Sequence, residues 1–457
     1  TPDRTRRAAQ PSELPFHHAQ PTEWRPYHAT LSRVDVWGCH RQCSLRGRPP
    51  SETLEVCQSD ATATAMCVIC DFFAGKTPTN TTVCAPCRDA AQDQANWAWL
   101  PKVHLHIHLE GALRLQTVIE LAEKHGLAET AATDDPRGYY LTAEPFENLS
   151  ALLDRFGRSQ RVLRDLADVE RVAFECVEDA HRDRVVALEL RYAPSFLSGG
   201  HSYSWDDALD AVRAGVERAR KAYPVEVGLL CIAVGAAGPE SVRDTVDFLL
   251  RRRDAFIGFD CAGAELDLAQ WAPDFARVRA AGIPATCHAA EDLGACPSNG
   301  RVAVDVLGAV RVGHGLQILR DPGSLAAVLE KRAVLEVSVS SNYLTSAVPS
   351  LAAHPARELW NKGVRITVNS DDPGIMDLTL SGEYAVWQDV LGFSDAELVQ
   401  CNLTALAASF LPAATKKRVY DAAFAARPRR PRTAPRVLVA AALAAGALCV
   451  VARRRSP

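Results

Sequence analysis

The chain has 457 residues, which is enough for one large domain with additions or for two to three ordinary domains. Its hydrophobic content of 47% and its charged content of 23% predict a soluble globular protein. The net charge of −4 argues against nucleic acid as a partner, because nucleic-acid-binding domains are normally strongly basic.

Residues 1–95 are predicted to form a Cys-rich extension, which begins with a flexible arm rich in Arg, Pro, His and Gln. Within residues 67–87, two Cys-X-X-Cys pairs flank a spacer of thirteen residues. Two such pairs are typical of a tetrahedral structural zinc site. The alternative is an unfolded extension, and a disulfide framework is less favoured because nothing else indicates secretion. The expected zinc ligands are Cys67, Cys70, Cys84 and Cys87.

Residues 96–415 alternate short apolar runs with amphipathic stretches such as Asp206–Ala222 and Gly300–Leu307. This alternation predicts parallel βαβ units, and eight runs in roughly 300 residues predict an α/β fold of the (β/α)8 TIM-barrel type. We expect residues 112–184 to form a helical insertion after the first strand, over the C-terminal mouth of the barrel. The expected strands are Val103–His108, Val185–Ala193, Val225–Val234, Ala255–Cys261, Pro284–His288, Ala309–Gly313, Ala333–Val339 and Val364–Ser370.

Residues 416–436 are basic and Pro-rich and are predicted to be a linker. In the tail 437–457, the apolar run Val437–Ala452 would span roughly 24 Å as a helix, which is less than the roughly 30 Å of a hydrocarbon core. We expect either a C-terminal membrane anchor, an apolar helix packed on protein, or an unstructured tail.

Scattered single cysteines among apolar neighbours, such as Cys176, Cys231 and Cys261, are typical of a reducing compartment. The start of the given sequence has no signal-peptide pattern. We therefore expect a cytoplasmic protein, with membrane attachment through the tail as the alternative.

The first expected strand carries His104, His106 and His108 at alternate positions, which share one face of a regular strand. Buried imidazoles need polar partners, and a divalent metal is a common partner of neutral imidazole. The alternative is a solvent-facing strand edge that happens to carry histidines.

Further chemically active residues follow three other expected strands. In a TIM barrel, the C-terminal ends of the strands meet at one mouth, so these residues should converge there although they are far apart in sequence. Each is weak evidence alone, and the joint placement is what indicates an active site. They are His288, Glu291, His314, Asp371 and Asp372.

The motifs that contain these residues resemble the adenosine deaminase family of metal-dependent amidohydrolases. They occur in family order over residues 101–412. The matching segments are Pro101–Ala112, Phe259–Gly263, His288–Glu291, Arg311–Gly315, Ser340–Asn342 and Asn369–Pro373.

The resemblance implies that His106, His108, His288 and Asp371 bind one catalytic Zn²⁺. It leaves His104 out, because the family commonly has Glu or Asp at that position. A bound zinc ion lowers the pKa of its water toward about 7 and so supplies hydroxide.

The resemblance also assigns the catalytic groups. His314 and Asp371 would take the proton of the attacking water and stabilise its charge. Glu291 would protonate N1 of the purine, which requires that burial raises the pKa of its carboxyl group.

The resemblance further implies a substrate pocket. His108 lies in it, Glu110 binds the ribose 5′-hydroxyl, the Gly263 amide binds N3 and Asp372 binds N7. The insertion offers an apolar lid over this pocket, and ordinary helix packing is an equal alternative for its residues. The lid candidates are Leu149, Leu152 and Phe156.

Three departures from the family pattern bear on which purine is bound and not on whether it is deaminated. Ala290 replaces a frequent Gly, Ser338-Val339 replaces a frequent Cys-Pro, and Glu110 replaces a frequent Asp. The run Gly111–Arg114 favours a nucleoside over free adenine.

The expected activity is zinc-dependent hydrolytic deamination of adenosine or 2′-deoxyadenosine, with a small-molecule purine nucleoside as partner. Free adenine, N6-methyl-AMP and aminodeoxyfutalosine remain alternative substrates. Two further hypotheses are a metal barrel that hydrolyses a phosphoester and a non-catalytic binding protein. Phosphoester hydrolysis commonly uses two metals bridged by a modified Lys, and no Lys lies at a strand end here. A non-catalytic protein would be expected to have lost some of the metal ligands, whereas all four are present. The sequence leaves the oligomeric state open.

Overall fold

The computed structural model describes residues 93–128, 133–142, 144–146, 149–263 and 267–430. The chain is divided between Thr82 and Val83, and all described residues belong to the second part, Val83–Pro457. The expected zinc ribbon, the expected membrane anchor and most of the Cys-rich extension lie outside the described residues. Within the described ranges, no helix combines the length and the apolar character needed to cross a membrane.

Eight parallel strands form the centre of the described unit, in two ladders with the orders β1-β2-β3-β4 and β5-β6-β7-β8. Each overlaps an apolar run predicted from the sequence, and β4 begins three residues later than expected. The strands are β1 Lys102–His108, β2 Val185–Tyr192, β3 Glu226–Val234, β4 Gly258–Ala262, β5 His288–Ala289, β6 Arg311–His314, β7 Val334–Val337 and β8 Arg365–Val368.

Backbone bridges join the two ladders at both edges, so the sheet curls in the manner of a TIM barrel. Phe259 of β4 pairs with Ala285, and Ile107 of β1 pairs with Asp371 beyond β8. The fifth strand is much shorter than expected. Pro284, at its expected start, has no backbone N–H to donate to a neighbouring strand.

A side chain completes the junction between β8 and β1. Oδ1 of Asn369 accepts hydrogen bonds from the backbone amides of Leu105 and His106, each at 3.1 Å. The β1–β2 register shifts between His104 and Ile107, so β1 is irregular at this point. A buried amide side chain therefore satisfies backbone donors beside the metal-site histidines.

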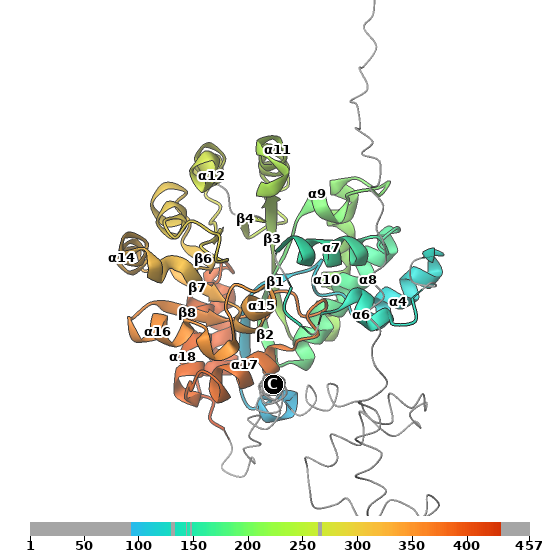
Figure 1. Ribbon diagram of the computed structural model, residues 1–457. Helices are drawn as coiled ribbons and strands as arrows, with labels where there is room; N and C mark the ends of the chain where they lie inside the picture. The colour runs from blue at the N-terminus through green and yellow to red at the C-terminus, as the bar shows by residue number, and fades with distance from the viewer. Residues whose placement is uncertain (1–92, 129–132, 143, 147–148, 264–266, 431–457) are drawn as a thin grey trace, which may run out of the picture. The chain divides into compact units, whose positions relative to one another are not determined.

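Helices surround the strands, and Figure 1 shows α11, α12, α14, α16 and α18 on the outside of the barrel. The described part of the region 112–184 contains the helices α4, α6, α7 and α8, in agreement with the predicted helical insertion. The helices are α4 Leu115–Lys124, α6 Pro136–Tyr140, α7 Leu149–Gln160, α8 Leu166–Arg182, α9 Pro194–Leu197, α10 Trp205–Ala222, α11 Pro239–Arg251, α12 Ala272–Ala280, α13 Asn299–Arg301, α14 Pro322–Lys331, α15 Val339–Leu344, α16 Ala356–Asn361, α17 Leu380–Asp389, α18 Asp395–Ala408 and α19 Ala413–Val419.

Short helices of other types connect several of these elements. The 3₁₀ helices are η1 Gly235–Ala237, η2 Leu268–Trp271, η4 Leu316–Arg320 and η5 Leu351–Ala353, and the π-helical turns are η3 Val302–Val306 and η6 Tyr420–Phe424. The expected helix Gly300–Leu307 is thus a short α-helical turn followed by a π turn.

The local sequence explains why the longer helices form where they do. In α10, the Ser204 side chain accepts from the Asp207 amide, and the Asp207 carboxylate accepts from the Ser204 amide, which satisfies two donors at the helix start. Leu209, Val212 and Val216 recur at helical spacing and are buried. The helix therefore packs one apolar face inward.

The core between helices and strands contains the cysteines that the sequence analysis assigned to the interior. Cys176, Cys231 and Cys261 are buried and unpaired. Each behaves as a small apolar side chain.

Candidate metal centre and active-site pocket

The four predicted metal ligands come together at the C-terminal ends of the strands. His106 and His108 belong to β1, His288 begins β5, and Asp371 follows β8. Their ligand atoms all lie within 4.8 Å of one another. Oδ1 of Asp371 is 3.1 Å from Nε2 of His106 and 3.3 Å from Nε2 of His108.

Hydrogen bonds around this cluster make it suitable for a cation. Nδ1 of His106 lies 2.8 Å from a carboxylate oxygen of Glu336, and Nδ1 of His288 lies 3.1 Å from one of Asp260. A carboxylate only accepts, so each Nδ1 carries the proton and each Nε2 presents a lone pair to the cluster. Lone pairs that converge beside a carboxylate repel one another unless a cation lies between them.

The donor set also fits the metal expected from the sequence. Three imidazole nitrogens and one carboxylate oxygen are a common set for Zn²⁺ and for related divalent transition metals. His104 stands apart from this set, as predicted, because its Nε2 accepts from the backbone amide of Ser370 at 3.1 Å.

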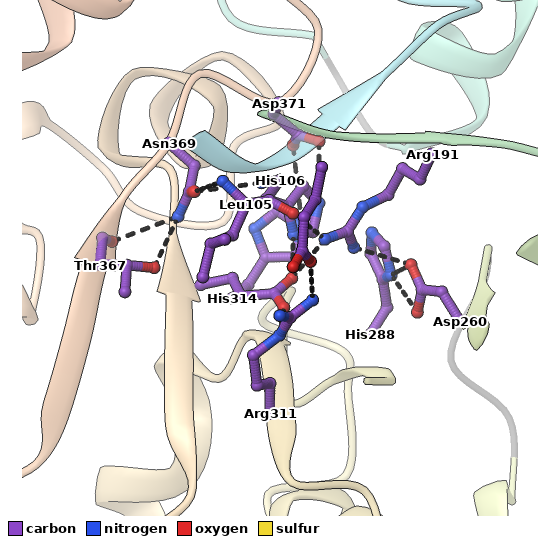
Figure 2. A network of polar contacts seen from close by, with 12 residues as sticks. Leu105, His106, Arg191, Asp260, His288, Arg311, His314, Thr367, Asn369 and Asp371 are labelled. Carbon is purple, nitrogen blue, oxygen red and sulfur yellow. Dashed lines mark hydrogen bonds and ion pairs between the residues drawn. The ribbon is translucent and has the colours of Figure 1, made fainter. Parts of the chain in front are cut away.

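Beneath the cluster lies a fully buried ion network that the sequence analysis did not find (Figure 2). Arg191 of β2 donates to Asp260 at 2.8 Å and to Glu336 at 2.7 Å. Arg191 therefore links the two carboxylates that orient His106 and His288. Burial alone would raise the pKa of Asp260 and of Glu336. The positive charge of Arg191 and of nearby His and Arg side chains outweighs burial, so both pKa values lie below the ordinary value.

Arg311 of β6 extends the network toward the other end of the barrel. It donates to Glu336 and to Glu189 of β2, each at 2.6 Å, and to the backbone oxygen of Ala408 at the end of α18. A signal for this network was present in the sequence. Charged residues inside apolar strands are rarely buried unless they are paired.

A cavity of about 220 Å³ opens beside the metal cluster. Leu152 and Phe156 of α7, two of the three lid candidates, line it and also belong to a packed hydrophobic cluster, and the Leu149 side chain lies outside the described part of the chain. The predicted substrate-binding residues His108, Glu110, Gly263 and Asp372 also line it, together with Glu291 and His314.

Two buried carboxylates in this cavity have an oxygen without a hydrogen-bond partner. Glu110 accepts from the Ala193 amide at 2.7 Å through Oε1, and its Oε2 is unpaired. Oδ1 of Asp372 is likewise unpaired. A buried unpaired oxygen is unfavourable in the protein alone and is typical of a group that binds a ligand.

Burial raises the pKa of both carboxyl groups. The pKa of Glu110 rises to about 8. The pKa of Asp372 lies well above its ordinary value because of burial and the nearby carboxylates of Asp371, Glu110 and Glu291. Near neutral pH, burial therefore favours the protonated form of both carboxyl groups, and a protonated carboxyl group can donate a hydrogen bond to a ligand.

His314 and Glu291 complete the polar end of the cavity. Nε2 of His314 is 3.6 Å from Glu291 and 3.7 Å from Asp371. Although Asp371 raises it, burial and the neighbouring histidines keep the pKa of His314 well below its ordinary value, so the ring is neutral near pH 7. The His314 ring therefore lies beside both carboxylates at the polar end of the cavity.

The backbone at three of these strand ends is left-handed at residues other than glycine. The φ angles are +53° at Ala290, +61° at His314 and +63° at Asp371. Such angles cost L-residues about 1–2 kcal/mol each and concentrate at functional sites. In this protein the three residues lie where the backbone leaves β5, β6 and β8.

Comparisons with known proteins agree with this geometry. Residues 101–425 match the adenosine deaminase family. An adenosine deaminase from Shewanella denitrificans is 34% identical over 328 residues, which are 71% of this chain and 98% of that protein.

Two solved structures share the fold. An amidohydrolase from Burkholderia ambifaria with bound zinc is 27% identical, with a TM-score of 0.65 over 75% of this chain and 93% of that chain. The Arabidopsis N6-mAMP deaminase is 25% identical, with a TM-score of 0.63 over 73% of this chain and 99% of that chain. With its His/Asp metal site at the mouth of a parallel barrel, the chain belongs to the adenosine deaminase family and is a metal-dependent deaminating hydrolase.

Proposed function

We propose that the protein is a zinc-dependent aminohydrolase that converts adenosine and 2′-deoxyadenosine to inosine and 2′-deoxyinosine with release of ammonia. The observation that carries this proposal is one small cavity that combines the His/Asp cluster, Glu291 and two unpaired buried carboxyl oxygens. The activity requires each of these groups in a different role.

His106, His108, His288 and Asp371 would hold the zinc ion. When bound, zinc acts as a Lewis acid that makes water a stronger nucleophile at neutral pH. The protein's own contribution is to fix these ligands, because Glu336 and Asp260 orient the rings of His106 and His288.

Glu291 is the proposed proton donor to N1 of the purine. An aromatic amidine carbon is a poor electrophile, and a proton on N1 draws electron density away from C6. Glu291 is 8% exposed and lines the cavity beside His314. Deamination explains why a carboxyl group stands there, whereas phosphoester hydrolysis leaves it without a role.

Asp372 and Glu110 are the proposed contacts to the two ends of a nucleoside. N7 of a purine is an acceptor, so the partner must donate, and the raised pKa of Asp372 supports a protonated carboxyl group there. Glu110 has a free oxygen for the ribose 5′-hydroxyl. Gly263 also lines the cavity, and its amide is the proposed donor to N3.

The charge of the cavity favours a nucleoside over a nucleotide. Among the described residues that line it, none is Lys or Arg, while Glu110, Glu291, Asp371 and Asp372 are acidic. A phosphate group normally requires cationic or multiple N–H partners. A free base would leave Oε2 of Glu110 unpaired. Adenosine and 2′-deoxyadenosine therefore fit better than N6-methyl-AMP or adenine.

The test is steady-state deamination by the full-length protein with adenosine, 2′-deoxyadenosine, adenine and N6-methyl-AMP, alongside the variant Glu291→Gln. We expect turnover of the two nucleosides and a loss of about 10³-fold or more in the variant. Preferred turnover of N6-methyl-AMP would assign a nucleotide substrate instead. Absence of turnover of all four, with one zinc ion bound in the barrel, would overturn the proposal.

A further inference from the structure

His354 is a buried histidine outside the cavity and outside the metal cluster. It lies between η5 and α16, and its side chain is 4% exposed. It does not line the cavity and has no role in the proposed chemistry. A buried imidazole needs partners for both ring nitrogens.

Two hydrogen bonds through Asn342 connect His354 to His314, and a third holds the far side of the His354 ring. The Ala356 backbone amide donates to Nδ1 of His354 at 3.1 Å. Nε2 of His354 lies 3.2 Å from Oδ1 of Asn342. Nδ2 of Asn342 lies 3.0 Å from Nδ1 of His314. Asn342 is fully buried and follows directly after Ser341, which donates to Asp371.

The Ala356 amide fixes the donor and the acceptor of each hydrogen bond between His354 and His314. A backbone N–H only donates, so Nδ1 of His354 accepts and the proton of the neutral ring is on Nε2. That N–H donates to Asn342, which must therefore present Oδ1 to His354 and its NH₂ group to His314. Since an amide NH₂ only donates, Nδ1 of His314 accepts.

We propose that His354 is a positioning residue that, acting through Asn342, holds His314 in the tautomer with its proton on Nε2. This inference rests on the proposed function and deepens it. Nε2 of His314 faces the space between Glu291 and Asp371, at 3.6 and 3.7 Å. In this tautomer it presents an N–H to that space.

This tautomer gives His314 and Asp371 different roles, because only Asp371 can accept the proton of the attacking water. As the water oxygen forms its bond to C6, the C6–N1 π bond breaks toward N1, the water O–H bond breaks, and that proton passes to a carboxylate oxygen of Asp371. N1 receives its proton from Glu291. His314 keeps its own proton throughout and donates a hydrogen bond to the attacking oxygen, because its Nε2 has no lone pair to accept one.

The tautomer can be measured without turnover and without metal. The metal-free, full-length protein, labelled with ¹⁵N-histidine, is examined by NMR, and the His314 signals are identified by their loss in His314→Gln. We expect an unprotonated, pyridine-like Nδ1 and a protonated Nε2. A protonated Nδ1 in the wild-type protein overturns the proposal, whether or not the enzyme deaminates adenosine.

Two substitutions test the direction of the relay. In Asn342→Asp the side chain can only accept, so we expect the proton of His314 to move to Nδ1. In His354→Leu nothing fixes the Asn342 amide, and a mixture of both tautomers should appear. His354→Gln keeps a donor to Asn342 and should restore the wild-type pattern. A His314 signal that is unchanged in Asn342→Asp would contradict the relay.

Kinetics supply a second readout on the preferred substrate. We expect kcat to fall about tenfold in His354→Leu and about 100-fold in Asn342→Asp, with KM changed less than about threefold, as is usual when a residue orients another. His354→Gln should recover kcat to within about threefold. The matched control is Thr345→Val, which removes a hydroxyl that contacts the Asn342 backbone oxygen and leaves the relay intact. Equal losses in Thr345→Val and His354→Leu would overturn the assignment.

Discussion

Gly111 and Asp372 lie so close together that a methyl group on Gly111 would be 1.9 Å from Oδ1 of Asp372. We therefore expect Gly111→Ala to displace this carboxyl group from the cavity. Because a shift of about 1 Å at a reacting group costs roughly 100-fold in rate, kcat/KM should fall by about that factor. The metal content should stay unchanged, since Gly111 contacts a metal ligand through a backbone hydrogen bond, from its amide to the His108 carbonyl oxygen at 3.2 Å, and the ligand side chains keep their positions. Steady-state kinetics and metal analysis check both expectations.

The control for this substitution is Gly323→Ala in α14. A methyl group there would meet its nearest atom at 3.5 Å, which is an ordinary contact. Wild-type kinetics in Gly111→Ala would show that Asp372 does not need its observed position.

Arg191 should contribute strongly to stability, because it is the cation shared by two buried carboxylates. Arg191→Met leaves Asp260 and Glu336 facing each other without it, and we expect a loss of about 3–5 kcal/mol in the free energy of unfolding. Urea denaturation of the metal-free protein measures this loss. Zinc affinity, measured by competition with a chelator, should fall as well, because His106 and His288 lose their orientation.

A surface arginine provides the comparison. Arg220 pairs with Glu217, and both side chains are substantially exposed. Arg220→Met should therefore cost less than about 1 kcal/mol. Equal effects of the two substitutions would show that the buried network does not contribute as proposed.

Removal of the metal should abolish deamination and leave the barrel folded. We expect a chelator to eliminate turnover and added Zn²⁺ to restore it. Zn²⁺ should also raise the unfolding temperature, because a ligand that binds only the folded state stabilises it. His288→Ala should lack this thermal shift.

The number of zinc ions per chain tests the Cys-rich extension at the same time. Two ions per full-length chain, with one lost in Cys67→Ser, would support a structural zinc ribbon. One ion in both proteins would restrict zinc to the barrel.

Ala290→Gly should stabilise the protein. Ala290 adopts a φ of +53°, which glycine adopts without strain. Relief of about 1–2 kcal/mol of strain is partly offset by the greater entropy of glycine in the unfolded chain, so a net gain of about 0.5–1 kcal/mol is expected. Thermal or urea denaturation measures it. A destabilised variant would show that the Ala290 methyl group is required for packing.

Glu383 of α17 should make stability depend on pH. It is buried, accepts from the amides of Val339 and Ser340, and burial raises its pKa to about 7 from an ordinary 4.5. The folded protein thus binds this proton more tightly than the unfolded chain. Its stabilising contribution is complete below about pH 4.5 and is lost as the pH rises to about 7, by about 3 kcal/mol.

Glu383→Gln should remove this pH dependence, which urea denaturation between pH 5 and pH 8 can measure. Glu397 serves as the control, because its pKa is lowered and not raised. Against the effect of burial, Arg357 and Ser394 hold its pKa at about 2. Glu397→Gln should change stability by a constant amount over the same pH range. Parallel curves for the wild type and Glu383→Gln would contradict the expectation.

The parts of this fold that could be predicted from sequence are those with a local signal. Most strands contain a short apolar run rich in β-branched residues, and the ligands His106, His108, His288 and Asp371 stand at or just beyond the ends of the predicted runs. The parallel-barrel pattern alone then brings them to one mouth. The fifth run differs most, because regular pairing is confined to His288–Ala289 and the residues before it join β4 through an isolated bridge at Ala285.

The rest depends on partners that are distant in sequence. Arg191 finds its carboxylates on β4 and β7, and His354 reaches His314 only through Asn342. A sequence pattern shows that such side chains are buried charges or imidazoles, but it does not show which partner satisfies them. That choice is made by the three-dimensional packing of separate strands.

The Asn369 side chain that completes the junction of β8 and β1 also sets a condition on how the protein forms during synthesis. The His106 amide has its hydrogen-bond acceptor on Asn369, 263 residues later in the chain, so this bond cannot form until Asn369 has been synthesised. At about 5–20 residues per second, the ribosome needs roughly 13–53 s to reach that asparagine. The ladder β1–β4 is made first and exposes two open edges during this interval. A nascent barrel of this kind is therefore most exposed to aggregation just before its last strand emerges, which is when chaperones would be most effective.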